Sequence, residues 1–171
     1  MEKGYIHVYT GNGKGKTTAA LGLAVRAVCA GKKVFFGQFI KGMDYSELKS
    51  VDFIPNLEIE QFGRDCFIYK EPTEDDIKRA REGLEKCREI LKEGKYDLVV
   101  LDELNIAIYY KLFTIEETIE MIRNRASHVE VVITGRYAEK EIIELADLVT
   151  EMKEIKHYYT QGVGARKGIE C

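Results

Sequence analysis

The chain has 171 residues, of which 45% are hydrophobic, and this length and composition predict one domain over residues 1–171. The formal net charge of −3 excludes the overall basic field with which proteins hold nucleic acids through counterion release. The longest apolar stretch, residues 19–30, contains Arg26 and is too short to span a bilayer, and no signal-peptide core precedes the first predicted strand. We therefore expect a cytoplasmic protein that binds neither nucleic acid nor membranes.

The first predicted elements are a strand over residues 5–9 and a helix over residues 17–30, with a glycine-rich loop between them. The strand is the apolar run Y-I-H-V-Y, and the helix ends before Gly31, a residue typical of helix C-termini. The helix is apolar on most faces, which indicates that it is buried. The order strand, loop and helix is the setting that a phosphate-binding loop requires.

The loop, T-G-N-G-K-G-K-T-T over residues 10–18, predicts a nucleotide site. Its glycines lack the Cβ atoms that would block a phosphate chain, and the helix N-terminus adds partial positive charge. Lys16 would neutralise phosphate oxygens, and the Thr17 hydroxyl would reach a magnesium ion. The strict pattern G-x-x-x-x-G-K-[ST] has glycine where this chain has Thr10, so we interpret Gly11 as the turning residue. The predicted nucleotide-binding residues of the loop are Gly11, Asn12, Gly13, Lys14, Gly15, Lys16, Thr17 and Thr18.

The second predicted strand, residues 34–40, reads V-F-F-G-Q-F-I and is apolar except for Gln38. A continuously apolar strand indicates burial on both faces, as in a parallel sheet. Ligands of open α/β sheets bind beyond the carboxyl ends of the strands, and Lys41 follows this end. Gln38 and Lys41 are therefore candidate site residues, with a solvated strand end as an equally good interpretation.

Residues 43–56 are polar and irregular, and residues 57–62 predict a third strand. The loop that follows carries Phe67 and Ile68, and an exposed apolar loop indicates a binding partner. Thr73 predicts the start of a long helix with a capping box. The apolar residues of this helix recur at spacings of three and four and predict one face packed on the sheet: Ile77, Ala80, Leu84, Cys87 and Leu91.

A fourth apolar strand, residues 98–101, leads into Asp102 and Glu103. Two carboxylates at the carboxyl end of a buried strand are typical of the second half of a nucleotide site, where an acidic group holds magnesium directly or through water. The alternative is that these acids cap a helix. The P-loop earlier in the chain favours the metal role.

The remaining segments continue the alternation of strands and helices. Arg136 follows a strand and would lie on the same rim as the P-loop and the two acids. The final residues, 157–171, are rich in glycine and are either flexible or ordered by a ligand. The alternation predicts a three-layer α/β fold with a mostly parallel sheet flanked by helices, in the P-loop NTPase (RecA-like) architecture. The predicted elements here are a helix over residues 114–124, a strand over 130–134, a helix over 140–146 and a strand over 148–152.

The cysteines and histidines match no metal-ligand spacing and form no C-x-x-C pair. We therefore expect reduced thiols and singly placed histidines, with neither a zinc site nor a disulfide framework. These residues are Cys29, Cys66, Cys87, Cys171, His7, His128 and His157.

Three classes of protein are compatible with the motifs. A hydrolase would use Glu103 to activate water, a kinase would present a second substrate to the γ-phosphate, and a binding module would hold nucleotide without consuming it. Motor ATPases usually act through added domains or polymer contacts, and this chain is short and acidic. That observation weakens the hydrolase class without removing it.

Five ordered motifs resemble the P-loop family of ATP:corrinoid adenosyltransferases and cover nearly the whole chain. The ending K-G-I-E, residues 167–170, is also similar to that family. Together the motifs are far more specific than a P-loop alone. They are Y-T-G-N-G-K-G-K-T-T-A (residues 9–19), Q-F-I-K-G (38–42), V-V-L-D-E-L-N (99–105), I-T-G-R (133–136) and A-D-L-V-T-E-M (146–152).

The resemblance implies a transferase of cobalamin biosynthesis that moves the 5′-deoxyadenosyl group of ATP to Co(I) of a corrinoid and releases triphosphate. It implies Lys16 and Glu103 as catalytic residues, Thr17 and Glu103 as Mg²⁺ ligands, and Arg136 as a contact of a reversed nucleotide whose C5′ faces the corrinoid. It also implies a homodimer and an electron-donor protein as partner. A small P-loop ATPase or phosphotransferase is the alternative.

The resemblance further implies how the corrinoid is bound. In the family, aromatic residues after the third strand displace the lower ligand of cobalt. This chain reads D-C-F-I over residues 65–68, where relatives resemble G-F-T-W. Phe67 and Ile68 are therefore the expected corrinoid contacts, together with Gln38 and Lys41. Cys66 is not expected to bind cobalt, because a thiolate would restore the coordination that must be lost.

Overall fold

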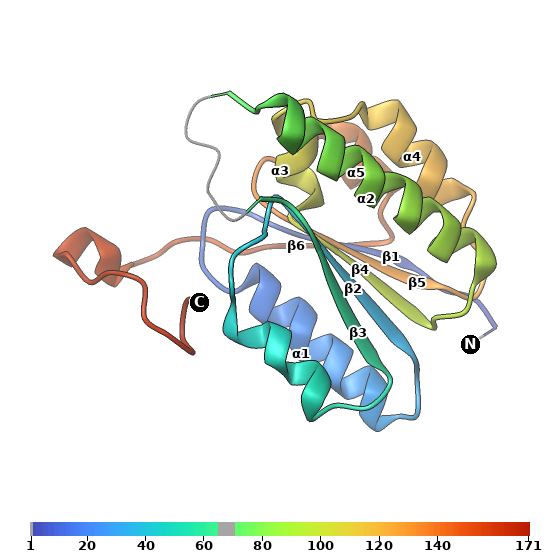
Figure 1. Ribbon diagram of the computed structural model, residues 1–171, viewed down its shortest axis with the longest axis horizontal. Helices are drawn as coiled ribbons and strands as arrows, with labels where there is room; N and C mark the ends of the chain where they lie inside the picture. Colours follow the sequence, from blue (N-terminus) through green and yellow to red (C-terminus); the bar gives the residue numbers. More distant parts are fainter. Residues whose placement is uncertain (1, 65–70) are drawn as a thin grey trace.

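The computed structural model describes residues 2–64 and 71–171, and a sheet of six parallel strands forms the centre of this part of the chain (Figure 1). The strand order is β3-β2-β4-β5-β1-β6, and each pairing is parallel. The predicted α/β fold with a mostly parallel sheet is therefore confirmed. The strands are β1 (Ile6–Thr10), β2 (Val34–Phe39), β3 (Leu57–Phe62), β4 (Leu98–Asp102), β5 (Glu130–Thr134) and β6 (Leu148–Glu151).

Helices cover both faces of the sheet and complete the three predicted layers (Figure 1). One face carries α1 (Lys16–Cys29) and the short 3-10 helix η1 (Ser46–Asp52), and a second 3-10 helix, η2 (Tyr158–Gln161), lies near the end of the chain. In the ranges that the structure describes, no helix combines the length and apolar character needed to cross a bilayer. The other face carries α2 (Glu74–Glu93), α3 (Leu104–Tyr109), α4 (Ile115–Arg123) and α5 (Lys140–Leu145).

Alternate residues of the strands build two cores, one on each face of the sheet. Val99 and Leu101 of β4 pack in the core beneath α2, whereas Val100 packs with Ala20 and Ala24 of α1. All five side chains are fully buried. Because strand side chains point alternately to the two faces and helices cover both, residues 98–101 of β4 are all apolar, and only Asp102 at its carboxyl end is polar.

The structure adds three elements that the sequence did not predict, and one of them is η2 near the end of the chain. Helix α3 starts directly after β4 at Glu103, which has φ 58° and makes no side-chain capping bond, so the sequence shows no start signal. Helix η1 lies in the segment predicted to be irregular and is too short to show a periodic pattern. β2 ends at Phe39, one residue early, because Ile40 has φ 65°. The other predicted elements are found with ends shifted by at most one residue.

Asp76 fixes the start of α2 and ties it to the chain that follows β3. Its carboxylate accepts hydrogen bonds from the Thr73 N–H at 2.8 Å and the Thr73 hydroxyl at 2.7 Å, which completes the predicted capping box. Arg64 donates to the same carboxylate from Nε at 2.6 Å and from Nη2 at 3.0 Å. Burial opposes ionisation, but the bonds from Arg64 and Thr73 outweigh it and hold the pKa of Asp76 below its ordinary value.

The Asp76→Asn variant is expected to lower the free energy of unfolding at pH 7 by about 2 kcal/mol, because it loses a cap and a charged pair. Folding lowers the pKa of Asp76. The carboxylate therefore makes its full contribution to the free energy of unfolding above the unfolded-state pKa of about 4, and this contribution is lost as the pH falls through the folded-state pKa. In urea unfolding, the difference between wild type and variant should therefore shrink below pH 4. The Asp75→Asn variant changes an exposed carboxylate of the same turn and is the control. Equal losses in both variants would contradict this role of Asp76.

Candidate active site

The glycine-rich loop joins β1 to α1 at the carboxyl edge of the sheet, as predicted. Gly11 and Gly15 have φ angles of 96° and 118°, a conformation that favours glycine. Gly15 caps α1, and its carbonyl accepts the Ala19 N–H at 2.7 Å. The start of this 14-residue helix, with its partial positive charge, therefore faces the loop.

The loop also packs against the chain that follows β6. The Gly13 N–H donates to the Met152 carbonyl at 2.7 Å, and the Met152 N–H donates to the Thr10 carbonyl at 2.8 Å. A Cβ on Gly11 would lie 2.4 Å from the Met152 carbonyl oxygen, and a Cβ on Gly13 would lie 2.8 Å from the Lys153 carbonyl carbon. Backbone packing therefore requires glycine at both positions, a reason additional to the room that phosphates need.

Lys16 points back into the loop. Its side chain is 7% exposed, and its ammonium group donates to the carbonyls of Gly11 at 2.9 Å and Gly13 at 2.8 Å. Burial lowers the pKa of Lys16, and the attraction of Glu103 opposes this shift. Phosphate oxygens carry negative charge, so they would attract the same ammonium group more strongly than the carbonyls do and would favour its charged form. The loop thus places the Lys16 ammonium where it can bind a phosphate group.

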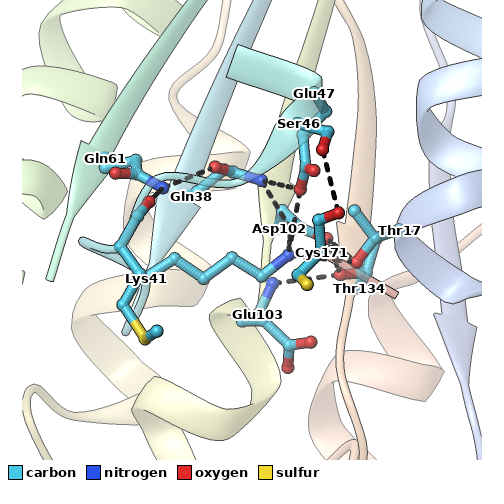
Figure 2. A network of polar contacts seen from close by, with 11 residues as sticks. Thr17, Gln38, Lys41, Ser46, Glu47, Gln61, Asp102, Glu103, Thr134 and Cys171 are labelled. Carbon is cyan, nitrogen blue, oxygen red and sulfur yellow. Dashed lines mark hydrogen bonds and ion pairs between the residues drawn. The ribbon is translucent and has the colours of Figure 1, made fainter. Parts of the chain in front are cut away.

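Asp102 is the centre of the polar network in Figure 2 and is fully buried. One carboxylate oxygen accepts the hydroxyls of Thr17 at 2.9 Å and Thr134 at 2.6 Å. The other accepts the Lys41 ammonium at 2.8 Å and the Gln38 amide at 3.4 Å. These four donors use the acceptor positions of both oxygens. Asp102 therefore orients the Thr17 hydroxyl and balances the charge of Lys41.

Glu103 turns the chain from β4 into α3. Its φ of 58° is a left-handed conformation that is uncommon for a residue with a side chain, and its N–H donates to the Thr134 hydroxyl at 3.0 Å. Figure 2 shows its carboxylate directed away from the Asp102 network. Within residues 2–64 and 71–171, no donor is bonded to that carboxylate, and burial together with the charge of Asp102 raises its pKa. Strain, burial and unused oxygens indicate a ligand-binding group.

A cavity of about 640 Å³ lies above the loop and collects most of the predicted site residues. Gln38 is not among them, because it is fully buried and its amide bonds Asp102 and Glu47 in the interior. Phe67 and Ile68 lie outside the described residues. The predicted residues that line the cavity are Asn12, Gly13, Lys14, Gly15, Lys16, Thr17, Thr18, Lys41, Glu103 and Arg136.

The cavity has a further wall that the sequence analysis missed. Part of it comes from the segment entering η1, and part comes from the end of the chain, where Ser46 donates its hydroxyl to the Cys171 carbonyl at 2.9 Å. Thr134 was also missed, although its place at the end of β5 on the predicted rim was a usable signal. The sequence analysis described residues 157–171 as flexible or ordered by a ligand, but it could not place them at this cavity, because a long-range contact brings them there. The residues of this wall are Tyr45, Ser46, Glu47, His157 and Gly168 to Cys171.

The sheet and the loop define this chain as a three-layer α/β protein with a P-loop NTPase-like fold. A sequence model of the family described as ATP:corrinoid adenosyltransferase BtuR/CobO/CobP matches residues 2–171. The chain belongs to this family, which confirms the resemblance seen in its motifs.

Curated relatives are similar to this chain over nearly its whole length. The corrinoid adenosyltransferase of Escherichia coli strain K12 is 38% identical over 169 residues, which are 99% of this chain and 86% of the relative. Corrinoid adenosyltransferase CobA of Salmonella typhimurium strain LT2 is 37% identical with the same shares covered. A corrinoid adenosyltransferase of a Sinorhizobium species is 37% identical over 180 residues, covering 99% of this chain and 81% of the relative.

Proposed function

We propose that this chain is the transferase that moves the 5′-deoxyadenosyl group of ATP to Co(I) of a corrinoid, with triphosphate as the second product. Family membership supports this function. The observation that carries it is the cavity in which the loop, Thr17, Glu103 and Arg136 converge. The electron pair of Co(I) forms the bond to C5′ while the bond from C5′ to the triphosphate oxygen breaks, and that electron pair leaves with triphosphate. The protein must therefore position ATP and stabilise the charge of its leaving group.

We propose that the backbone of residues 11–18, the Lys16 ammonium and Arg136 bind the triphosphate. The N–H groups at the start of α1 and the Lys16 ammonium face the same cavity, where they would stabilise negative charge as it develops on the leaving oxygens. Arg136 is exposed at the cavity rim, and its planar guanidinium can donate two parallel hydrogen bonds to a phosphate. These contacts act on the leaving group and need no nucleophilic side chain.

The residues present also fit a magnesium ion held by Thr17 and Glu103. Both line the cavity. Asp102 accepts the Thr17 hydroxyl hydrogen and Lys41 donates to the Thr17 oxygen at 3.4 Å, which leaves one lone pair of that oxygen for a cation. Two protein ligands suit Mg²⁺, which usually completes its octahedron with water and phosphate oxygens. When bound, the ion would neutralise part of the triphosphate charge.

Lys41 has a different proposed role from the one first expected. Its ammonium lies 2.8 Å from Asp102, 3.4 Å from the Thr17 hydroxyl and 3.7 Å from Glu47. We propose that Lys41 positions the side chains it contacts in the nucleotide-binding part of the site. Phe67 and Ile68 remain the proposed corrinoid contacts. From the family resemblance we also propose a cytoplasmic homodimer that receives electrons from a partner protein and binds neither nucleic acid nor membranes.

An anaerobic assay with ATP, Mg²⁺ and chemically reduced cobalamin tests the proposed function. Adenosylcobalamin should appear in the corrinoid absorbance spectrum together with an equimolar amount of triphosphate. Formation of ADP or orthophosphate with an unchanged corrinoid would instead support a P-loop ATPase or phosphotransferase. ATP that binds but is not consumed would support a binding module.

A further inference from the structure

The final segment, residues 157–171, leaves the body of the protein and returns to the nucleotide cavity. Figure 1 shows it in red, extending beyond β6 and then turning back toward the start of α1. Residues Gly168 to Cys171 line the cavity, and the bond from the Ser46 hydroxyl to the Cys171 carbonyl anchors them on the side of η1. The segment therefore completes a site whose other wall is the P-loop.

Lys14 is the P-loop residue that holds this segment. Unlike Lys16, which points into the loop, Lys14 points away from it and donates to the Tyr158 hydroxyl at 3.1 Å, the Ile169 carbonyl at 3.0 Å and the Glu170 carboxylate at 2.6 Å. An ammonium group has three N–H donors, so these bonds use all of them. The hydrogen bond to Glu170 is the main cause of the raised pKa of Lys14.

Glu170 is the common partner of the residues that shape the segment. Its carboxylate accepts bonds from Lys14, the Tyr158 hydroxyl, and the Arg166 guanidinium and N–H. The bonds from Arg166, then those from Lys14 and Tyr158, hold the pKa of Glu170 below its ordinary range, so the carboxylate is charged at neutral pH. One acidic side chain thus closes the segment on itself and attaches it to the loop.

Apolar burial contributes little to this attachment. Tyr159 and Ile169 of the segment are 73% and 55% exposed, and Ile155 just before it is 89% exposed. Exposed ion pairs are individually weak. The segment is therefore held mainly by a small polar cluster and can detach without disturbing either core.

We propose that Lys14 and Glu170 are positioning residues that fasten residues 157–171 over the nucleotide cavity, so that the segment forms one wall of the ATP site. This proposal rests on the proposed function for the identity of the nucleotide. The alternative role for Lys14 is direct phosphate binding. The two roles differ in what they predict for Glu170, because a carboxylate would hinder rather than help a phosphate ligand.

The test compares Lys14→Met, Glu170→Gln and the double variant, with the exposed Lys156→Met as matched control. Limited trypsin digestion reports attachment of the segment through cleavage after Arg166 and Lys167, and calorimetric titration reports the Kd of MgATP. Both single variants should increase the cleavage rate and the Kd by about three- to tenfold, the range expected when a weak polar cluster is lost. The double variant should be no worse than either single one, and the control should match wild type.

The outcomes separate the possibilities. If Glu170→Gln leaves both cleavage and Kd unchanged while Lys14→Met weakens ATP binding, Lys14 is a phosphate ligand and the proposal is overturned. Additive effects in the double variant would also overturn it. Neither readout uses the corrinoid, so these results stand apart from the adenosylation assay, whose failure would refute the proposed function and leave the attachment intact.

Discussion

The Lys16→Ala variant is expected to lower kcat/KM for ATP by about a hundred- to a thousandfold, the scale on which preorganised donors stabilise developing negative charge. In the structure the Lys16 ammonium is buried in the loop and bonded to the Gly11 and Gly13 carbonyls. Triphosphate would take over these bonds, and no other ammonium group described in the structure donates to these two carbonyls. The loss should appear in both ATP affinity and turnover, because Lys16 contacts ground state and leaving group alike.

Calorimetric titration with MgATP and the adenosylation assay measure this loss. The exposed Lys33→Ala variant is the control for a change of one positive charge, and it should behave as wild type. Thermal unfolding followed by circular dichroism shows whether the Lys16→Ala protein still folds. Unchanged affinity for ATP in a folded Lys16→Ala protein would refute the assignment of residues 10–18 as the nucleotide site.

The Glu103→Gln variant is expected to need at least about ten- to a hundredfold more Mg²⁺ for half-maximal activity, because changing even a residue that only supports a metal ligand weakens metal binding by this much. It should also unfold at a temperature equal to or above that of wild type. Burial and the neighbouring Asp102 raise the pKa of Glu103, so its negative charge destabilises the fold above that pKa, and a neutral amide removes the penalty. Loss of function with gain of stability would identify a residue retained for its chemistry.

The Asp102→Asn variant provides the contrast, since it changes the adjacent carboxylate. Asp102 is fully buried and bonded to Lys41 at 2.8 Å, so its neutralisation leaves a cation without its counter-charge and should lower stability by about 3 kcal/mol. Activity titrated against Mg²⁺ and urea unfolding separate the two acids. A Glu103→Gln protein with normal Mg²⁺ dependence, or one as unstable as Asp102→Asn, would show that Glu103 is structural.

The fold could be predicted because its main signals are local. β2 and β4 are short apolar runs with polar ends, and α2 begins with the capping box of Thr73 and Asp76, so each element is defined by neighbouring residues. Helix α3 could not be predicted, because its six residues follow the strained Glu103, which the rest of the site holds in place. Residues distant in the sequence hold Glu103 in this conformation, so the local sequence gives no sign of it.

The site could be predicted where a residue follows a strand on the carboxyl edge, as Glu103 and Arg136 do. Gln38 shows the limit of this reasoning. It lies opposite Asp102 in the pairing of β2 with β4, so its side chain joins the buried network rather than the rim. Strand register and side-chain direction depend on which strands pair, and the linear sequence does not give the pairing. The same holds for the wall formed by Gly168 to Cys171.

The attachment of the P-loop to the end of β6 has a consequence for motion. β6 lies at the edge of the sheet and all four of its residues are exposed, so it belongs to the part of the sheet that opens at low free-energy cost. When β6 frays, the Met152 carbonyl leaves the Gly13 N–H and the loop loses the backbone packed behind it. Amide hydrogen exchange in the strand and in the loop should therefore be coupled. A nucleotide that stiffens the loop would slow exchange along an edge strand that it never touches.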